Sequence, residues 1–261
     1  MKIHNTHNSQ SGFNRVTVVT SSLVAIIIIS SLLYFFVWRP TDNDYRAAAA
    51  QVSSMKESSD ALTSALAVVQ DPASITTVTA AKVESAVNGY QQTLSTLGTS
   101  VVVSRDLTVK STYDQTKSSL EKYKQSLNDL VKSLKLYTAA LDSCTKFTYS
   151  ASGTDLNVKN KLLNVCLGDL NNGLDSKYKA FNDQYFNEYI DHTAKYVGAT
   201  VSEIKATDQA TSAAAVAAIN QAYDAIQALG KKEIDYSLSV PADALNKLSS
   251  IIDSQRKALI R

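Results

Sequence analysis

The stretch from Val109 to Cys144, VKSTYDQTKSSLEKYKQSLNDLVKSLKLYTAALDSC, decides the fold of this 261-residue chain. Residues suited to a helix interface recur in it at alternating steps of four and three. They are Val109, Tyr113, Thr116, Leu120, Tyr123, Leu127, Leu130, Leu134, Tyr137, Leu141 and Cys144. Such a 3.5-residue repeat keeps one face of a helix against its partners along its whole length. We therefore predict one helix about 50 Å long, at a rise of about 1.5 Å per residue.

The same spacing predicts two amphipathic helices before this stretch, at 45–69 and 83–97. Pro72 separates these two, because proline disfavours α conformation in the residue before it. Gly98 and the valine run 101–103 separate the second helix from the long one. Three successive helices with short connections predict antiparallel hairpins.

Four more amphipathic segments follow the loop at 145–154, at 156–166, 174–192, 216–226 and 245–259. The chain contains only eight glycines and three prolines, too few for the many turns of an all-β domain of this size. We predict an all-α fold, an elongated antiparallel bundle or coiled coil of six or seven helices. It forms either one domain or two halves, 42–144 and 155–261.

The segment Val16–Trp38, VTVVTSSLVAIIIISSLLYFFVW, contains no charged residue and is longer than the roughly 20 residues that span a bilayer as a helix. A cleaved signal peptide is the alternative, with a small-residue site at 47–50, but bulky residues follow the apolar stretch directly. We predict a cytoplasmic tail at 1–15, a transmembrane signal anchor at 16–38 and an extracytoplasmic domain at 39–261. The protein is then a single-pass cell-membrane protein with its N-terminus in the cytoplasm.

Within the predicted span, Thr17, Ser21 and Ala25 recur every fourth residue and share one helix face. Small residues at this spacing let a second helix approach closely, which predicts a homo-oligomer through the transmembrane helix. The alternative is that these small side chains face lipid. The chain lacks any Asn-x-Ser/Thr sequon, which favours a bacterial source.

The part of the chain beyond the predicted span is electrically neutral. The formal net charge of the whole chain is +2, and residues 1–38 hold Lys2 and Arg15 but no acidic residue. Nucleic-acid binding requires a concentrated excess of Lys and Arg, so we expect no nucleic-acid partner.

Cys144 and Cys166 are the only cysteines, and they flank the loop that follows the long helix. In an oxidising compartment outside the cytoplasm, this placement predicts a disulfide. The alternative is a pair of buried free thiols, because cysteine packs well as a small apolar residue.

No motif predicts catalysis, a metal or another cofactor. His192 is the only histidine beyond the N-terminal tail, and its neighbours Glu188 and Asp191 do not form the paired Glu-x-x-His motifs of a di-iron bundle. Gly-x-Ser-x-Gly, Walker, Gly-x-Gly-x-x-Gly and Cys-x-x-Cys motifs are absent. Tyrosine outnumbers phenylalanine thirteen to six. We interpret the tyrosines of the repeat as core, with a sugar or peptide groove as the alternative.

These patterns favour a non-catalytic interaction protein that acts in adhesion, envelope organisation or assembly, with an unidentified protein partner. A second hypothesis is a sensor or ligand-binding subunit. In outline the chain resembles the extracytoplasmic helical-bundle sensors of bacterial chemoreceptors, although it contains no second span and no signalling region. An extracytoplasmic enzyme is the third hypothesis.

Overall fold

The computed structural model describes residues 27, 29–30, 38–150 and 155–259, and these residues form helices and connections without strands. The elements are α2 (Asp42–Val68), η2 (Pro72–Ser74), α3 (Thr77–Gly98), α4 (Val101–Arg105), α5 (Leu107–Ser150), α6 (Leu156–Gly173), α7 (Lys179–Phe181), the π-helical turn η3 (Asn182–Phe186), α8 (Asn187–Lys205), α9 (Gln209–Leu229) and α10 (Ala242–Leu259). The all-α bundle is therefore confirmed for this part of the chain.

The described residues hold eight helices when α7, η3 and α8 are counted as one, rather than six or seven. The additional helix is α4, in the valine run that the sequence analysis interpreted only as a break. Ser100 caps it by accepting a hydrogen bond from the backbone NH of Val103 at 3.2 Å, and Val102 and Val103 are buried. A side-chain cap and two core contacts stabilise a helix that is too short to show periodicity.

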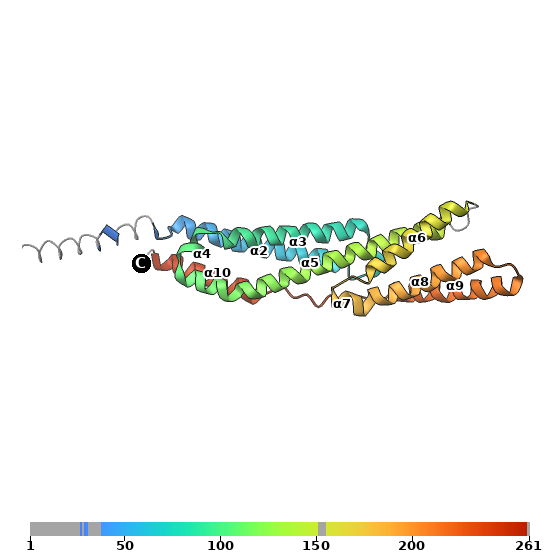
Figure 1. The fold of residues 1–261 in the computed structure, drawn as a ribbon. Coiled ribbons are helices and arrows are strands. Elements are labelled where there is room, and N and C mark those ends of the chain that lie inside the picture. The colour runs from blue at the N-terminus through green and yellow to red at the C-terminus, as the bar shows by residue number, and fades with distance from the viewer. Residues whose placement is uncertain (1–26, 28, 31–37, 151–154, 260–261) are drawn as a thin grey trace, which may run out of the picture.

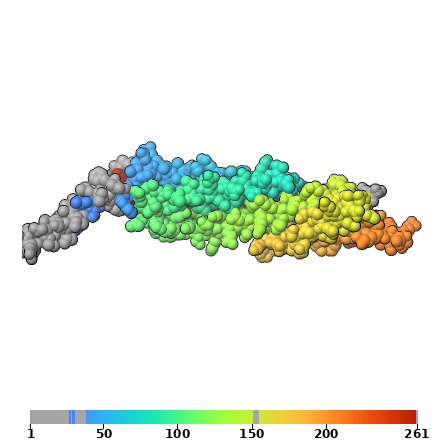
Figure 2. Space-filling view, turned by 45° about the horizontal axis from the view of Figure 1, so that its top comes forward, coloured from blue at the N-terminus to red at the C-terminus, as the bar shows by residue number. Residues whose placement is uncertain are grey.

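The helices form an elongated rod (Figures 1 and 2). In Figure 1, α2 runs away from the end of the rod that carries the C-terminus, α3 returns, and α5 then runs along most of the rod. We call the end that carries the start of α2, the α4–α5 corner and the C-terminal turn of α10 the proximal end. The distal end carries the end of α5, the start of α6 and the connection from α8 to α9.

Helix α5 belongs to both halves of the rod. Its first part packs with α3, α4 and α10, on which α2 packs in turn, to form the proximal half, and its last part packs with α6 and α8 in the distal half. Helix α9 pairs with α8. Because α10 packs on α2 and α5, the alternative division into 42–144 and 155–261 separates segments that contact one another. One hydrophobic core runs through both halves, from Tyr45 to Ile252.

The predicted seam of α5 faces this core. Ten of its eleven positions are buried, and Leu141 is half-buried. The helix begins at Leu107, after Asp106, whose carboxylate accepts hydrogen bonds from the backbone NH groups of Thr108 at 2.8 Å and Val109 at 3.1 Å. This cap satisfies donors that a helix N-terminus otherwise leaves free.

An aromatic cluster fills the junction where α5 exchanges proximal partners for distal ones. Tyr137 of α5 is surrounded edge-on by four rings, those of Phe181, Tyr185, Phe186 and Tyr189, at centroid distances of 4.9–5.9 Å. Edge-to-face packing of this kind is favourable beyond the area that it buries. The Tyr137 hydroxyl also lies 3.0 Å from the Tyr185 hydroxyl.

The connection between α9 and α10 crosses this junction as a strap. The Tyr236 hydroxyl donates a hydrogen bond to the carbonyl of Val69 at 2.6 Å, and the Ile234 NH donates to the carbonyl of Gln70 at 2.8 Å. The Tyr178 hydroxyl donates in turn to the Tyr236 carbonyl. The strap thus donates hydrogen bonds to the backbone carbonyls that follow α2. Through Tyr178 it also connects this backbone to the distal half.

Two glycines of α6 provide a matched test of this packing. At Gly173, an added Cβ would lie 2.9 Å from Phe186 Cζ and 3.0 Å from Ile190 Cδ1, whereas at exposed Gly168 it would meet nothing within 4 Å. We expect Gly173→Ala to lower the free energy of unfolding by about 1–3 kcal/mol through overpacking. Gly168→Ala should raise it by about 0.5–1 kcal/mol through helix propensity. Thermal melts followed by circular dichroism measure both, and equal shifts of the same sign would contradict the packing of α6 on α8.

Candidate functional site

Several predicted sites lie outside the described residues. These are the packing face Thr17, Ser21 and Ala25, the tail 1–15, and most of the predicted span 16–38. Among the helices that the structure describes, none is long and apolar enough to cross a membrane.

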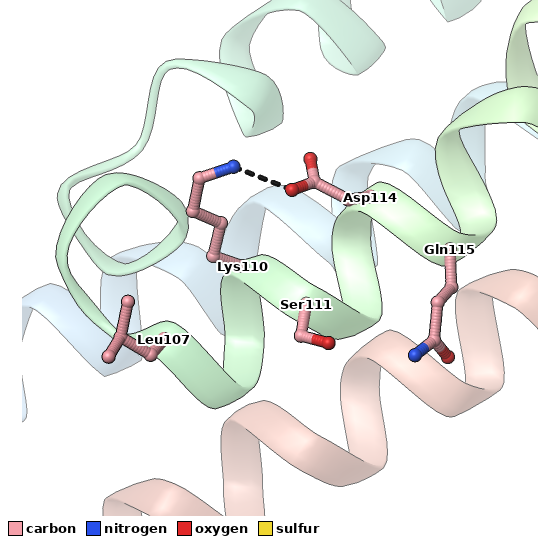
Figure 3. A pocket seen from close by; sticks show the side chains of 5 residues that line it. All are labelled: Leu107, Lys110, Ser111, Asp114 and Gln115. Carbon is pink, nitrogen blue, oxygen red and sulfur yellow. Dashed lines mark hydrogen bonds and ion pairs between the residues drawn. The ribbon is translucent and has the colours of Figure 1, made fainter.

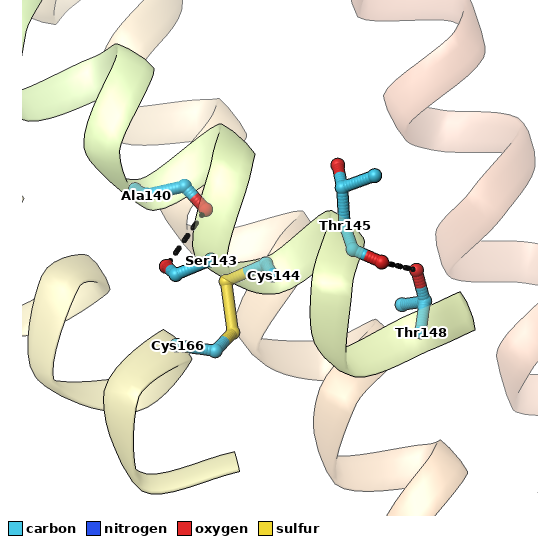
Figure 4. The surroundings of a disulfide bond; sticks show 6 residues. All are labelled: Ala140, Ser143, Cys144, Thr145, Thr148 and Cys166. Atoms are coloured by element: carbon cyan, nitrogen blue, oxygen red, sulfur yellow. Dashed lines mark hydrogen bonds between the residues drawn. A yellow bond between two sulfur atoms is a disulfide. The ribbon is translucent and has the colours of Figure 1, made fainter. Parts of the chain in front are cut away.

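Cys144 and Cys166 lie together at disulfide distance. Their sulfur atoms are 2.01 Å apart and their Cα atoms 4.6 Å apart, across a sequence separation of 22 (Figure 4). Both side chains are buried, so the link joins the last part of α5 to α6 beneath the surface of the distal half.

A groove runs along the other side of Cys144, between α5, α8 and α9. Its lining residues are Leu141, Cys144, Thr145, Thr148, Tyr189, Thr193, Tyr196, Tyr223 and Ile226, and we call it the distal groove. The groove encloses about 160 Å³ and is mainly apolar. Sites for drug-sized ligands typically enclose about 300–1,000 Å³. The distal groove is therefore suited to one inserted side chain rather than to a whole small molecule.

The two walls of the groove differ in chemistry. The α5 wall consists of Leu141, Cys144, Thr145 and Thr148, and the Thr148 hydroxyl donates a hydrogen bond to the Thr145 carbonyl at 2.8 Å (Figure 4). On the opposite wall, the rings of Tyr196 and Tyr223 lie 6.5 Å apart, and Tyr223 is 51% exposed. A partner side chain entering the groove would contact α5 side chains on one side and tyrosine rings on the other.

Helix α9 presents an unusually neutral surface beside the groove. It contains one charged residue, Asp224, in 21 positions. Its buried residues Ala215, Ala222 and Leu229 face α8, while Val216 and Tyr223 are exposed. Other large apolar side chains exposed on the distal half are Tyr149, Leu156, Val158, Val165 and Leu167. Exposed apolar groups concentrated in one region are typical of protein-binding surfaces.

The repeat tyrosines Tyr113, Tyr123 and Tyr137 are buried in the core rather than exposed in a groove. Burial raises the pKa of Tyr123 to about 12, and it raises the pKa values of Tyr137 and Tyr189 further above their ordinary range. A phenol with a raised pKa stays protonated at neutral pH, so these hydroxyls are unsuited to act as general bases.

His192 lines a separate surface hollow between α8 and α9. The hollow has a volume of about 510 Å³, and its walls include Lys195, Gln221 and the small residues Gly198 and Ala218. His192 Nδ1 lies 3.7 Å from the carboxylate of Asp191. Within the described part of the chain, His, Cys, Asp and Glu side chains form no group of three that could hold a metal ion.

Comparison with known proteins assigns no relative. No family model matches the sequence, and no curated protein or solved structure matches it either. The function must therefore be argued from the geometry of the chain itself.

Sequence analysis did not predict the distal groove. Leu141 and Cys144 were assigned to the seam of the long helix, and Tyr223 and Ile226 to the apolar face of a later helix. The available signal was the composition of residues 209–229, which hold many alanines and a single charge. A helix that buries its apolar residues fully normally carries more charge on its solvent face.

We predict that the disulfide stabilises the distal half without being required for folding. Closing a loop of this length contributes about 3 kcal/mol in the chain-entropy model, so Cys144→Ser should melt at a lower temperature and remain helical. Protein isolated without reductant should show no alkylatable thiol. Two alkylatable thiols in the native protein would refute the pairing.

Alkaline pH should destabilise the bundle through its buried tyrosines. Because the pKa of Tyr123 is higher in the folded state, its stabilising contribution is complete below pH 10 and is lost as pH rises through about 12. Each such group lowers the free energy of unfolding by up to about 1.4 kcal/mol per pH unit in that window.

Tyr123→Phe is the matched variant for this effect, because the Tyr123 hydroxyl is buried without a hydrogen-bond partner. At pH 7 the variant should match the wild type within about 1 kcal/mol, since no hydrogen bond is lost. At pH 11 it should be the more stable of the two in denaturant titrations followed by circular dichroism. An unchanged difference between pH 7 and pH 11 would contradict the burial of this phenol.

Proposed function

We propose that this protein is a membrane-anchored helical rod that stands outside the cytoplasm and binds a protein partner through its distal half. Its role is non-catalytic, in adhesion, envelope organisation or assembly. The observation that carries the proposal is the distal groove between α5, α8 and α9, with Val216 and Tyr223 exposed on α9, in the half of the rod away from the start of α2.

The sequence supports the anchoring part of this proposal. The uncharged stretch 16–38 ends at Trp38, and the described chain enters the rod there, at its proximal end. Helix α5 alone extends over 44 residues, about 65 Å at 1.5 Å per residue. A rod anchored at one end would hold its far end well clear of the bilayer surface.

The chemistry of the distal half supports a protein as the partner. The groove admits one side chain, its walls are apolar and aromatic, and α9 beside it carries almost no charge. Protein interfaces place an apolar or aromatic anchor in such a pocket and surround it with weaker contacts. Threonine and tyrosine hydroxyls are present among the lining residues, but the lining surface is mainly apolar, which favours a protein side chain over a sugar.

A second candidate function is a sensor that acts through its partner. The hollow of about 510 Å³ between α8 and α9 lies in the range of small-ligand sites, and His192, Lys195 and Gln221 supply polar groups there. A ligand in this hollow would contact the two helices that also border the distal groove.

The test combines topology with partner capture in intact cells. Protease added to spheroplasts should remove the domain after Arg39 and spare residues 1–15. In the same cells, Tyr223→Asp should reduce crosslinking to the partner at least about tenfold, because it places a charge at the centre of an apolar contact. Val78→Asp is the matched control, since Val78 is exposed on α3, a helix that contributes no residue to the groove.

Protection of the C-terminus from protease would overturn the orientation. If Tyr223→Asp, Val78→Asp and the wild type crosslink to the partner equally, the distal groove is not the binding surface. A saturable small-molecule ligand whose binding depends on His192 would favour the sensor.

A further inference from the structure

The proximal end carries an apolar corner whose exposure the bundle does not explain. At the junction of α4 and α5, Leu107 is 79% exposed and Val101 is 38% exposed. Single exposed apolar side chains are common on proteins, so exposure alone argues little. This corner differs from such single side chains in two respects: it lies beside the predicted span, and hydrogen bonds hold its backbone in place.

The corner lies beside the point where the predicted span enters the rod. The guanidinium carbon of Arg105 lies 5.7 Å from the centre of the Trp38 ring, in a cation–π contact. Leu107 follows Arg105 by two residues, so their Cα atoms are at most about 7.6 Å apart. Trp38 ends the uncharged stretch 16–38, and tryptophan at the end of a span is typical of the membrane–water interface.

The corner is also held firmly in place. Asp106, between Arg105 and Leu107, caps α5 with one carboxylate oxygen and accepts a hydrogen bond from the Tyr45 hydroxyl with the other. Tyr45 is 3% exposed, so this bond connects the corner to the core of α2. The backbone that carries the exposed Leu107 side chain is therefore fixed by hydrogen bonds.

Polarity changes along the first turns of α5 in the order that a bilayer surface would require. Leu107 occupies the first turn, Lys110 and Ser111 the next, and Asp114 and Gln115 the one after (Figure 3). Lys110 Nζ lies 2.5 Å from Asp114 Oδ2, which leaves this pair without net charge. Leu107 is thus the first residue of α5, exposed Thr108 follows it, and the first charged side chain of the helix, that of Lys110, lies about 4.5 Å further along the helix axis.

We propose that the α4–α5 corner is a membrane footing, in which Leu107 and Val101 enter the interfacial layer of the bilayer beside Trp38. The inference rests on the proposed function, since it needs the anchor to span the membrane. The interfacial layer is about 5–7 Å deep on each side, enough to receive these side chains. The footing would fix the rod's angle to the membrane, because the anchor alone would leave a single point of attachment.

The footing is apolar rather than electrostatic. Two basic residues near the proximal end pair with one acidic residue: Arg46 contacts Asp42 at 2.6 Å, and Arg256 contacts the same carboxylate at 3.3 Å. Arg105 lies over the ring of Trp38. The corner should therefore bind neutral lipid as well as anionic lipid, unlike a polybasic surface.

The test uses the full chain in vesicles of phosphatidylcholine, with an environment-sensitive fluorophore on Leu107→Cys. The matched control is Leu156→Cys, because Leu156 is also the first residue of a helix, follows an aspartate cap and is 62% exposed, but lies at the distal end. Labelling is done without reductant, with the Cys144–Cys166 link checked by mass. Lipids brominated near the carbonyl group should quench the Leu107 probe at least about twofold more than the Leu156 probe.

The outcomes separate the footing from the anchor. If both probes escape quenching while the protein resists carbonate extraction, the footing is wrong and the anchor stands. If carbonate extracts the protein, the proposed anchoring fails and the footing with it. Equal quenching of both probes would mean that the rod lies flat, which also overturns the footing. Quenching of Leu107 that requires added phosphatidylglycerol would refute its apolar character.

Discussion

The buried face of α5 is the constraint on which the rest of the structure depends. One helix of 44 residues supplies the central surface for two sets of partners, α3, α4 and α10 on one side of the junction and α6 and α8 on the other. Because the heptad spacing continues without interruption, the same stripe that is buried in the proximal half emerges correctly oriented in the distal half. The two halves consequently share one core and cannot be separated by cutting the chain at a single loop.

Where α5 changes packing partners, other helices end and leave space beside it, and large aromatic rings fill this space. Tyr137 fills the space where helices end on either side, and the rings of α7, η3 and α8 surround it. The backbone after the end of α2 also carries carbonyl groups, those of Val69 and Gln70, that need hydrogen-bond donors. The strap through Ile234 and Tyr236 supplies them, and it returns the chain to the proximal half so that α10 can complete that bundle.

The ends of the rod differ in chemistry, and this difference gives the proposed function its direction. At the proximal end, Trp38 contacts Arg105 beside the α4–α5 corner, where Leu107 is exposed and the first charged side chain of α5, that of Lys110, lies three residues further along. The distal half holds a small apolar groove and a nearly uncharged helix. Buried tyrosines between them have raised pKa values and serve the core. The proposed attachment to a membrane at the proximal end and binding of a protein partner at the distal half would account for both surfaces.

The sequence by itself determined the all-α class, the start of the long helix to within two residues, and the closeness of Cys144 and Cys166. The end of the helix was predicted wrongly, because α5 continues six residues past Cys144 into the predicted loop. These follow from local rules: a repeat of 3.5 residues, the scarcity of glycine and proline, and a short loop between two cysteines. Only the tertiary structure decided that α10 returns to α2, that α4 forms, and that Leu141, Thr148 and Tyr223 meet in one groove. Periodicity shows which face of a helix is apolar but not which helix covers it, because many antiparallel arrangements bury the same stripes equally well. The choice among them depends on contacts between residues far apart in the chain, such as Tyr236 with Val69, which leave no pattern in either segment.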